Sequence, residues 1–351
     1  MKNLQENISE SRMAGCTLTG ALSVACFIPG AVTVVHAPKG CAHQTFSMLH
    51  ALMNEAETKI VPEILVSGLS DKDVIFGGEA CLNQALDRAA EKHPELIIVV
   101  TSCVPETIGD DCLAVCREHP YAASALYIPT SGFLGGSAKD GENAALIGLS
   151  TLAAPAEPIP GTVGIIGEKN LESEVEENFA EVSRLLDLLD LTVTVRFCRN
   201  AGIADLRKLG TVSCFILRDG RCADAGRELG KRFNRPVIGE FPRGLSGSIA
   251  FLQETGKACG LSADVIAEAI SKETEHQKMM LERFANLSES EVCLGVEPFE
   301  GTLAVAREAL KRLGMTESPK GIKVRLPFYL PVGVSGTMKM LYLWRRAILH
   351  G

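Results

Sequence analysis

Short β-branched runs alternate with helical patterns along this chain. In the first half, buried-strand patterns stand at Ala31–Val35, Leu96–Thr101 and Ala125–Pro129, and the amphipathic stretch Cys81–Lys92 precedes the second of them. Strands separated by helices pair in parallel, because each crossover helix returns the chain to the same edge of the sheet. The alternation therefore predicts an α/β fold built on a doubly wound parallel sheet.

The same alternation resumes after a proline-rich linker. Three prolines fall within Ala153–Gly161, and Thr162–Gly167 then begins a second set of strands and helices. After Gly260 comes the long helical pattern Asp264–Leu287, with Ser262 as its N-cap, and then a shorter strand–helix set. We therefore expect repeated Rossmann-like units, two of them full and a third shortened. The expected domains are residues 1–155, 156–260 and 261–351.

Composition and charge narrow the class of protein. The chain is 46% hydrophobic and 22% charged, as folded proteins are, with a net charge of -8, no run of like charges and 5% aromatic residues. These values disfavour nucleic-acid binding, which needs clustered Lys and Arg. The apolar stretch Leu22–Val35 is interrupted by Pro29 and Gly30, and Met1–Glu10 lacks the basic start of a signal peptide. We expect a cytoplasmic protein that binds neither nucleic acid nor membrane.

Cysteine is the unusual component, with twelve in the chain. The cytosol keeps thiols reduced, so these cysteines are expected to be either buried small hydrophobes or metal ligands rather than disulfides. No C-x2-C pair is present, which disfavours a zinc module.

Three of the cysteines lie beside Gly or at strand ends. Cys16 follows Gly15, Cys41 comes directly after the first predicted strand, and Cys103 follows the second. Parallel sheets bind ligands outside the carboxyl ends of their strands. Iron–sulfur clusters take thiolate ligands, although each cysteine taken alone is equally well explained as a buried hydrophobe. Three thiolates do not complete a four-iron cluster, so a fourth ligand would come from elsewhere, most simply from another subunit.

Motifs around these cysteines carry a family resemblance. Gly40–His43 (GCAH), Asp73–Glu79 (DVIFGGE) and Thr101–Asp111 (TSCVPETIGDD) closely resemble the nitrogenase component 1 family. That family includes both large subunits of the molybdenum–iron protein, their cofactor-assembly paralogues and dark-operative protochlorophyllide reductase. Weaker likeness extends over nearly the whole chain.

The resemblance implies roles for the three cysteines. Their spacing, 25 residues from Cys16 to Cys41 and 62 from Cys41 to Cys103, agrees with that of the family. By this resemblance the three are ligands of an iron–sulfur cluster, 4Fe-4S or larger, at a subunit interface. The protein would be an oxygen-sensitive homodimer, or a heterodimer with a paralogue.

The chain departs from the family at the second metal site. The resemblance places Arg218 near the family's cofactor-binding cysteine, with Cys214 and Cys222 to either side, and the shortened third domain has no histidine before His350. The loop Gly132–Gly135 also lacks the histidine that follows it in nitrogenase. Dinitrogen reduction is therefore not expected. Cys214 and Cys222 are interpreted as core thiols, with a second-cofactor role left open.

The implied function is that of a nitrogenase-like reductase. A separate ATP-dependent iron protein would deliver electrons, since this chain has no G-x4-GK[ST] loop of its own. The cluster would pass them to a substrate in an interdomain cleft, for example a tetrapyrrole-like or other small organic molecule. Two alternatives stay open: a scaffold for cluster or metallocofactor assembly without turnover, and a binding protein that has lost the metal.

Other side chains carry smaller predictions. His43, two residues past a ligand, is a candidate donor to a cluster sulfide or a proton relay, and Cys26 is a possible spare ligand. Asp110 and Asp111 are expected to face the positive end of a helix. Cys112 and Cys116, four residues apart, are expected to pack in the core.

Overall fold

The computed structural model describes residues 15–55, 60–132 and 136–350. Met1–Glu10 and most of the loop Gly132–Gly135 lie outside these ranges. The chain divides into two compact units, each described here by itself. The first comprises the chain up to Pro160 with residues 164–173 and 194–237, and the second comprises residues 161–163, 174–193 and 238–351. The predicted domain boundaries stay a prediction.

The first sheet has the strand order β2-β1-β3-β4, and all its pairings are parallel. Its strands are β1 (Ala31–His36), β2 (Ile64–Val66), β3 (Leu96–Thr101) and β4 (Ala125–Ile128). Three of these are the strands that the sequence predicts, within one residue at each end. The short β2 was not predicted, because three residues are too few to give a periodic signal.

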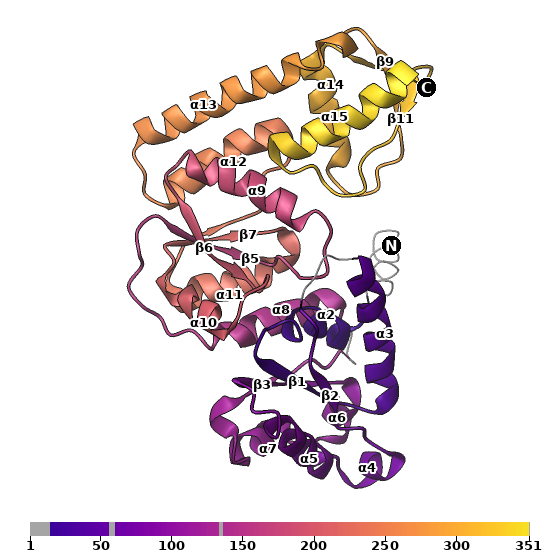
Figure 1. Cartoon of the computed structure of the whole chain (residues 1–351), viewed down its shortest axis with the longest axis vertical. Coiled ribbons are helices and arrows are strands. Elements are labelled where there is room, and N and C mark those ends of the chain that lie inside the picture. Colours follow the sequence, from indigo (N-terminus) through magenta and orange to yellow (C-terminus); the bar gives the residue numbers. More distant parts are fainter. Residues whose placement is uncertain (1–14, 56–59, 133–135, 351) are drawn as a thin grey trace. The chain divides into compact units, whose positions relative to one another are not determined.

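Helices cover both faces of this sheet, as Figure 1 shows. Alternate residues of β1 and β3 face opposite sides. Val35 and Ile98 pack with α2 and α8, whereas Val34 and Val99 pack with α5 and α7. This is the doubly wound arrangement that the sequence predicts. The helices of this part of the chain are α2 (Thr17–Ala25), α3 (Lys39–Glu55), α4 (Asp71–Phe76), α5 (Glu79–Ala90), α6 (Cys103–Ile108), α7 (Cys112–Glu118) and α8 (Ala138–Ser150).

Helices α2 and α8 cross at very short range because two glycines lie at the crossing. A Cβ atom at Gly20 would come within 1.8 Å of the Ala138 carbonyl oxygen, and one at Gly141 within 1.8 Å of the Thr17 carbonyl oxygen. Neither position can therefore hold a side chain without moving the two backbones apart. This contact holds the start of α2, where Cys16 lies, against the sheet.

Two further sheets follow. The second has the order β6-β5-β7-β8, and the third, with parallel pairings, has the order β10-β9-β11. Their strands are β5 (Thr162–Ile166), β6 (Thr192–Phe197), β7 (Cys214–Leu217), β8 (Val237–Ile238), β9 (Glu291–Leu294), β10 (Thr316–Glu317) and β11 (Ile322–Val324). Three separate sheets with helices between their strands confirm the predicted α/β class of repeated Rossmann-like units.

The remaining helices complete these units. They are α9 (Val175–Asp187), α10 (Ile203–Arg207), α11 (Ala223–Phe233), α12 (Gly244–Ala258), α13 (Ala263–Glu282), α14 (Thr302–Leu313) and α15 (Gly333–His350), with short 3-10 turns η1 (Ala122–Ser124), η2 (Lys208–Thr211), η3 (Gly220–Cys222) and η4 (Ala285–Leu287). Ser262 caps α13 by accepting the Val265 amide, as predicted. Within the described ranges, no helix combines the length and apolar character that crossing a membrane requires.

A buried polar network ties three helices of the second unit together. Arg184 of α9 donates to Glu181, in the same helix, and to Glu273 of α13, at 2.9 and 2.7 Å. Glu181 also accepts the Val334 amide in the first turn of α15, at 2.8 Å. The two carboxylates are 5% and 0% exposed, so Arg184 compensates two charges that water cannot reach.

We expect Arg184→Met to lower the free energy of unfolding by about 3 kcal/mol, since it leaves two buried carboxylates without their cation. Arg227→Met is the matched control, because its partner Asp224 is 49% exposed and the loss there should stay below about 1 kcal/mol. Urea denaturation followed by circular dichroism measures both. Equal losses in the two variants would contradict the role given to Arg184.

Candidate functional site

The structure brings the three predicted cysteines to one end of the first sheet. Cys41 lies in the first turn of α3, soon after β1 ends, and Cys103 is the first residue of α6, soon after β3 ends. β1 and β3 are neighbours, with His36 opposite Thr101, so the two cysteines follow adjacent strand ends. Cys16 reaches the same place from the start of α2, for which it is the N-cap residue.

A single cavity of about 520 Å³ joins the three cysteines. Besides the thiols, the described residues of its walls carry hydroxyl, amide and apolar side chains, and none of them carries a carboxylate. The lining residues are Gly15, Cys16, Leu18, Thr19, Cys41, Gln44, Thr45, Met48, Ser102, Cys103 and Gly136. The cavity therefore has three soft donors in a partly apolar setting, which suits an iron–sulfur cluster better than a hard cation.

The thiols lie close enough to influence one another. Burial raises the pKa of Cys41, the nearby thiols of Cys16 and Cys103 raise it further, and the neighbouring Ser102 side chain lowers it. The neutral thiol is therefore favoured at Cys41 unless a bound cation compensates the thiolate. Within the described residues, no three Cys, His, Asp or Glu side chains converge on one point as ligands of a single ion would. A cluster needs no such convergence, because each thiolate binds a different iron.

Hydrogen bonds connect the hydroxyl groups of two threonines that line this cavity. The Thr45 hydroxyl donates to the Cys41 carbonyl oxygen at 3.1 Å, and the Thr19 hydroxyl lies 3.5 Å from that of Thr45. Thr19 Oγ1 is also 3.6 Å from the Cys16 sulfur. These threonines fix the first turns of α2 and α3, and so they fix the backbone that carries two of the thiols.

A buried histidine organises the strand ends below the cavity. His36, the last residue of β1, is fully buried; its Nδ1 lies 2.8 Å from Ser67 Oγ and its Nε2 lies 3.0 Å from Asp110 Oδ2. Asp110 also accepts the Gly78 amide at 2.9 Å. A Cβ at Gly78 would clash with Leu69 and Asp110, which explains the second glycine of the DVIFGGE motif. No sequence motif predicted the part that Ser67 takes in this bridge.

Several smaller predictions are decided by burial. Cys112 and Cys116 are buried under the sheet as core thiols, as predicted, and burial raises their pKa values to about 12 and about 11. Cys26 is also buried, donates to the Leu22 carbonyl oxygen and does not line the cavity, so the spare-ligand prediction finds no support. His43 is exposed on α3, where its neighbour Gln44 faces the cavity instead.

The two aspartates behave differently from each other. Asp111 is the N-cap of α7 and accepts the Ala114 amide at 2.9 Å, as predicted for a helix start. The prediction was wrong for Asp110, which turns away from that helix to His36 and Gly78. Only the tertiary structure brings the buried imidazole of His36 to this carboxylate, 74 residues away in sequence.

The family model described as nitrogenase component 1 type oxidoreductase matches residues 16–319. This chain belongs to that family. Among curated relatives, it is 37% identical to the nitrogenase iron-molybdenum cofactor biosynthesis protein NifE of Clostridium pasteurianum, over 46% of this chain and 36% of that protein. It is 26% identical to the nitrogenase molybdenum-iron protein alpha chain of Methanothermococcus thermolithotrophicus, over 80% of this chain and 61% of that one.

Solved structures agree at the level of the fold. The structure titled "Nitrogenase Cp1 at pH 6.5" matches with a TM-score of 0.63 and 20% identity, over 89% of this chain and 61% of its own. The chain thus spans between about one third and three fifths of the length of these relatives.

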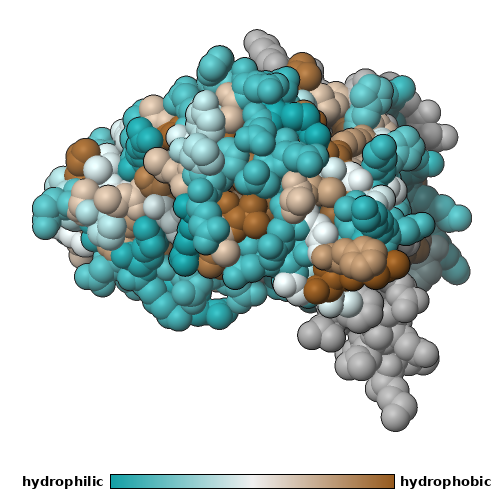
Figure 2. Space-filling model, turned by 90° about the horizontal axis from the view of Figure 1, so that it is seen from below, coloured by the Kyte–Doolittle hydropathy of each residue, from teal (hydrophilic) through white to brown (hydrophobic). Residues whose placement is uncertain are grey.

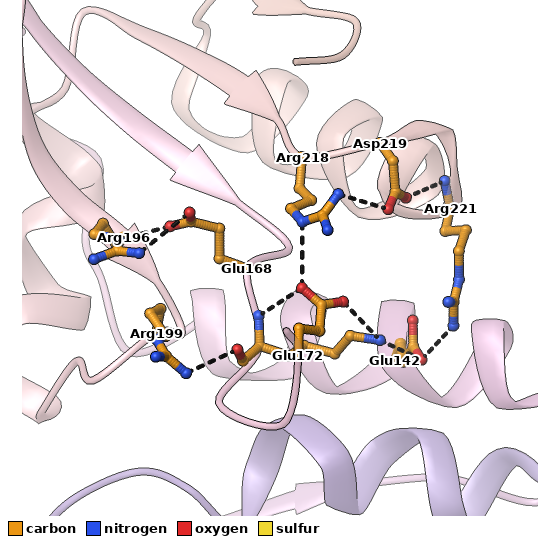
Figure 3. Close-up of polar contacts among 9 residues, drawn as sticks. Glu142, Glu168, Glu172, Arg196, Arg199, Arg218, Asp219 and Arg221 are labelled. Carbon is orange, nitrogen blue, oxygen red and sulfur yellow. Dashed lines mark hydrogen bonds and ion pairs between the residues drawn. The ribbon is translucent and has the colours of Figure 1, made fainter. Parts of the chain in front are cut away.

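Ion pairs surround Arg218, in the region where the family resemblance left a second cofactor open. Figure 3 shows Arg218, next after β7, paired with Glu172 at 3.2 Å and with Asp219 at 3.6 Å. In the same cluster Glu142 accepts from Lys169 and Arg221 at 2.8 and 2.6 Å. Arg218 is therefore part of a charge network at the ends of β5 and β7.

The two cysteines beside Arg218 are buried. Cys214 is fully buried within β7, and Cys222 is 5% exposed. The Cys222 sulfur packs so tightly against Gly167 that a Cβ there would come within 2.2 Å of it. Burial raises the pKa of Cys222 to about 12, which keeps the thiol protonated. These contacts favour the core-thiol interpretation for both.

We expect Asp110→Ala to lower the free energy of unfolding by about 2–3 kcal/mol, because the buried His36 ring and the Gly78 amide lose a charged partner. Asp111→Ala, which removes only a helix cap, should cost about 1 kcal/mol. Burial lowers the pKa of His36 below its usual 6.5, so the wild-type protein should also lose stability as the pH falls below about 6.5. Below that value the unfolded chain takes up a proton that the folded state excludes.

Chemical denaturation at several pH values measures these differences. Equal losses for the two aspartate variants would contradict the bridging role of Asp110.

Proposed function

We propose that this chain is the iron–sulfur-cluster-bearing component of a nitrogenase-like reductase. The observation that carries the proposal is the single cavity shared by Cys16, Cys41 and Cys103. Membership of the component 1 family gives that cavity its chemical interpretation. When bound, the cluster would supply one-electron transfer. The three cysteines would hold it, and Leu18 and Met48 would limit the access of water to it.

A second chain completes the proposed site. A four-iron cluster takes four ligands, and this cavity has three thiols among its lining residues. Cys16 is exposed at its position beside the cavity, so a thiolate or carboxylate of another chain can approach the same cluster. We therefore infer a homodimer, or a heterodimer with a paralogous component 1 chain, in the cytoplasm, where reducing conditions keep the thiols available.

An ATP-dependent iron protein is the proposed electron donor. At the end of α4, Ile75 and Phe76 are 74% and 79% exposed, and α4 lies against α6, the helix that begins with Cys103. Two adjacent apolar side chains this exposed make the end of α4 a candidate docking surface. The side of the molecule that carries α4 is mainly hydrophilic with separate hydrophobic patches (Figure 2). A donor seated on α4 would be one short helix away from the cluster.

We expect Phe76→Ala to weaken docking of an added ATP-dependent iron protein about tenfold, which corresponds to about 1.4 kcal/mol. Phe328→Ala, another exposed phenylalanine (66%) but in the second unit, is the matched control. The measurement is the dependence of cluster reduction rate on iron-protein concentration, with dithionite reduction as a check that the cluster is intact. Identical dependence in the wild type and Phe76→Ala would remove α4 from the docking surface.

The proposed substrate is a small organic molecule, for example one of the tetrapyrrole type. At the ends of β5 and β7 the carboxylates of Glu172 and Glu142 are already paired with arginines, which favours an organic acceptor over a second metallocluster. Dinitrogen reduction is not part of the proposal.

We expect anaerobically purified wild-type protein to contain about two to four irons per chain, with matching acid-labile sulfide and an EPR signal after dithionite reduction. Cys103→Ser should lose or alter the signal and lower the iron content. Cys293→Ser, which changes a partly exposed cysteine of the second unit, should leave both unchanged. Protein that stays folded, dimeric and iron-free even after reconstitution would favour the binding-protein alternative instead.

A scaffold for cluster or metallocofactor assembly is the second candidate. It is favoured by the relatives whose names describe cofactor biosynthesis, including the 37%-identical protein of Clostridium pasteurianum. The two functions differ in what leaves the protein. A scaffold transfers its cluster intact to a metal-free acceptor protein without ATP. A reductase keeps the cluster and passes electrons to a bound organic substrate only when the iron protein and ATP are present.

A further inference from the structure

The buried hydroxyl group of Ser102 has no hydrogen-bond partner. The residue is 3% exposed, and its amide donates to the His36 carbonyl oxygen at 3.1 Å, which fixes its backbone to the end of β1. In the part of the chain that the structure describes, four buried side-chain oxygens lack a hydrogen-bond partner: those of Thr17, Ser102, Ser183 and Thr255. Of these four residues, Ser102 is the one that lines the cavity of the three cysteines. A buried polar atom left unpaired costs stability, so its position calls for a ligand.

The local sequence explains why this hydroxyl is unused. Ser102 is the N-cap residue of α6, and an N-cap serine ordinarily accepts the amide of the second or third helical residue. Here the third residue is Pro105, which has no N–H to donate. No cap hydrogen bond forms. The hydroxyl therefore does not cap the helix and stays available to another acceptor.

This hydroxyl lies beside one thiol in particular. Ser102 and Cys41 line the same cavity, and the Ser102 side chain is close enough to the Cys41 sulfur to lower the pKa that burial raises. The neighbouring threonines are already engaged, since Thr45 donates to the Cys41 carbonyl oxygen and Thr19 lies between Thr45 and Cys16. The Ser102 hydroxyl therefore lines the cavity as a hydrogen-bond donor that lacks an acceptor. The Cys41 sulfur becomes such an acceptor when Cys41 is deprotonated.

We propose that Ser102 is a positioning residue whose hydroxyl donates a hydrogen bond to the Cys41 thiolate when the cluster is bound. This inference rests on the proposed function. Hydrogen bonds to the ligand sulfurs draw negative charge away from a cluster and stabilise its reduced form, which raises the reduction potential. Ser102 would thus set how readily the cluster accepts an electron, while the cysteines hold it.

The experiment compares anaerobically reconstituted wild type with Ser102→Ala, Ser102→Thr and Ser47→Ala. Ser102→Thr keeps the hydroxyl and serves as the rescue variant. Ser47, exposed on α3 and bonded to the His43 carbonyl oxygen, is the matched serine control. Each protein is assayed for iron content, for midpoint potential by EPR-monitored redox titration, and for exchangeable-proton coupling by deuterium ENDOR. Thermal unfolding of each metal-free protein is measured alongside.

We expect equal iron content in all four proteins. In Ser102→Ala the equilibrium for one-electron reduction should become about tenfold less favourable, a shift of about 59 mV to lower potential, with loss of one exchangeable-proton coupling. Ser102→Thr should restore both. The metal-free Ser102→Ala protein should unfold at no lower a temperature than the wild type, since the hydroxyl it lacks had no partner. A purely structural serine would instead destabilise the metal-free protein and leave the potential unchanged.

The outcomes distinguish the role of Ser102 from the proposed cluster-binding function. Loaded wild type with an unchanged potential and unchanged proton coupling in Ser102→Ala overturns the role of Ser102 alone. Loss of iron from Ser102→Ala at unchanged stability also overturns it, because Ser102 would then be a ligand rather than a hydrogen-bond donor. Wild type that stays iron-free after reconstitution overturns the proposed function, and this inference with it.

Discussion

The parallel pairing of β1 with β3 is the constraint on which the candidate site depends. In this register His36 lies opposite Thr101, so the two strands end side by side and the chain leaves both toward the same edge. Helices α3 and α6 begin within a few residues of these ends, and each carries its cysteine in its first turn. A slip of one residue would reverse which side chains face each layer of helices, and both hydrophobic layers specify the register.

Two local contacts hold the end of the first sheet, where the cysteines lie, in place. The contact of α2 with α8, possible only because Gly20 and Gly141 lack side chains, sets where Cys16 can lie. Below the cavity, the bridge from Ser67 through His36 to Asp110 joins the ends of β1 and β2 to the loop before α7. The motif residues that surround the cysteines thus act on the backbone. Gly78 and Asp110 help to fix the strand ends without lining the cavity, whereas Ser102, next to Cys103, lines it.

The assembled cavity is electrostatically unfavourable without cations. Three thiols share it, burial raises the pKa of Cys41, and the thiols of Cys16 and Cys103 raise that pKa further. A bound cluster would favour the thiolates instead, because iron binds them and hydrogen-bond donors stabilise the reduced cluster. The unpartnered hydroxyl of Ser102 fits the cluster-bound protein better than the metal-free protein. By contrast, the charges around Arg218 are already compensated by one another, which is why that region resembles a structural network more than a metal site.

The sequence by itself determined the α/β class, the three strand-bearing sets of elements and long strands such as Leu96–Thr101, and it singled out Cys16, Cys41 and Cys103 as candidate ligands. These follow from periodicity and from motifs that are local in the chain. It did not reveal β2, Ser67, the turn of Asp110 toward His36 or the spare hydroxyl of Ser102. Each of these depends on a partner tens of residues away, or on a hydrogen bond that fails to form. Residue types record what a side chain is able to do, but only packing decides which partner it meets.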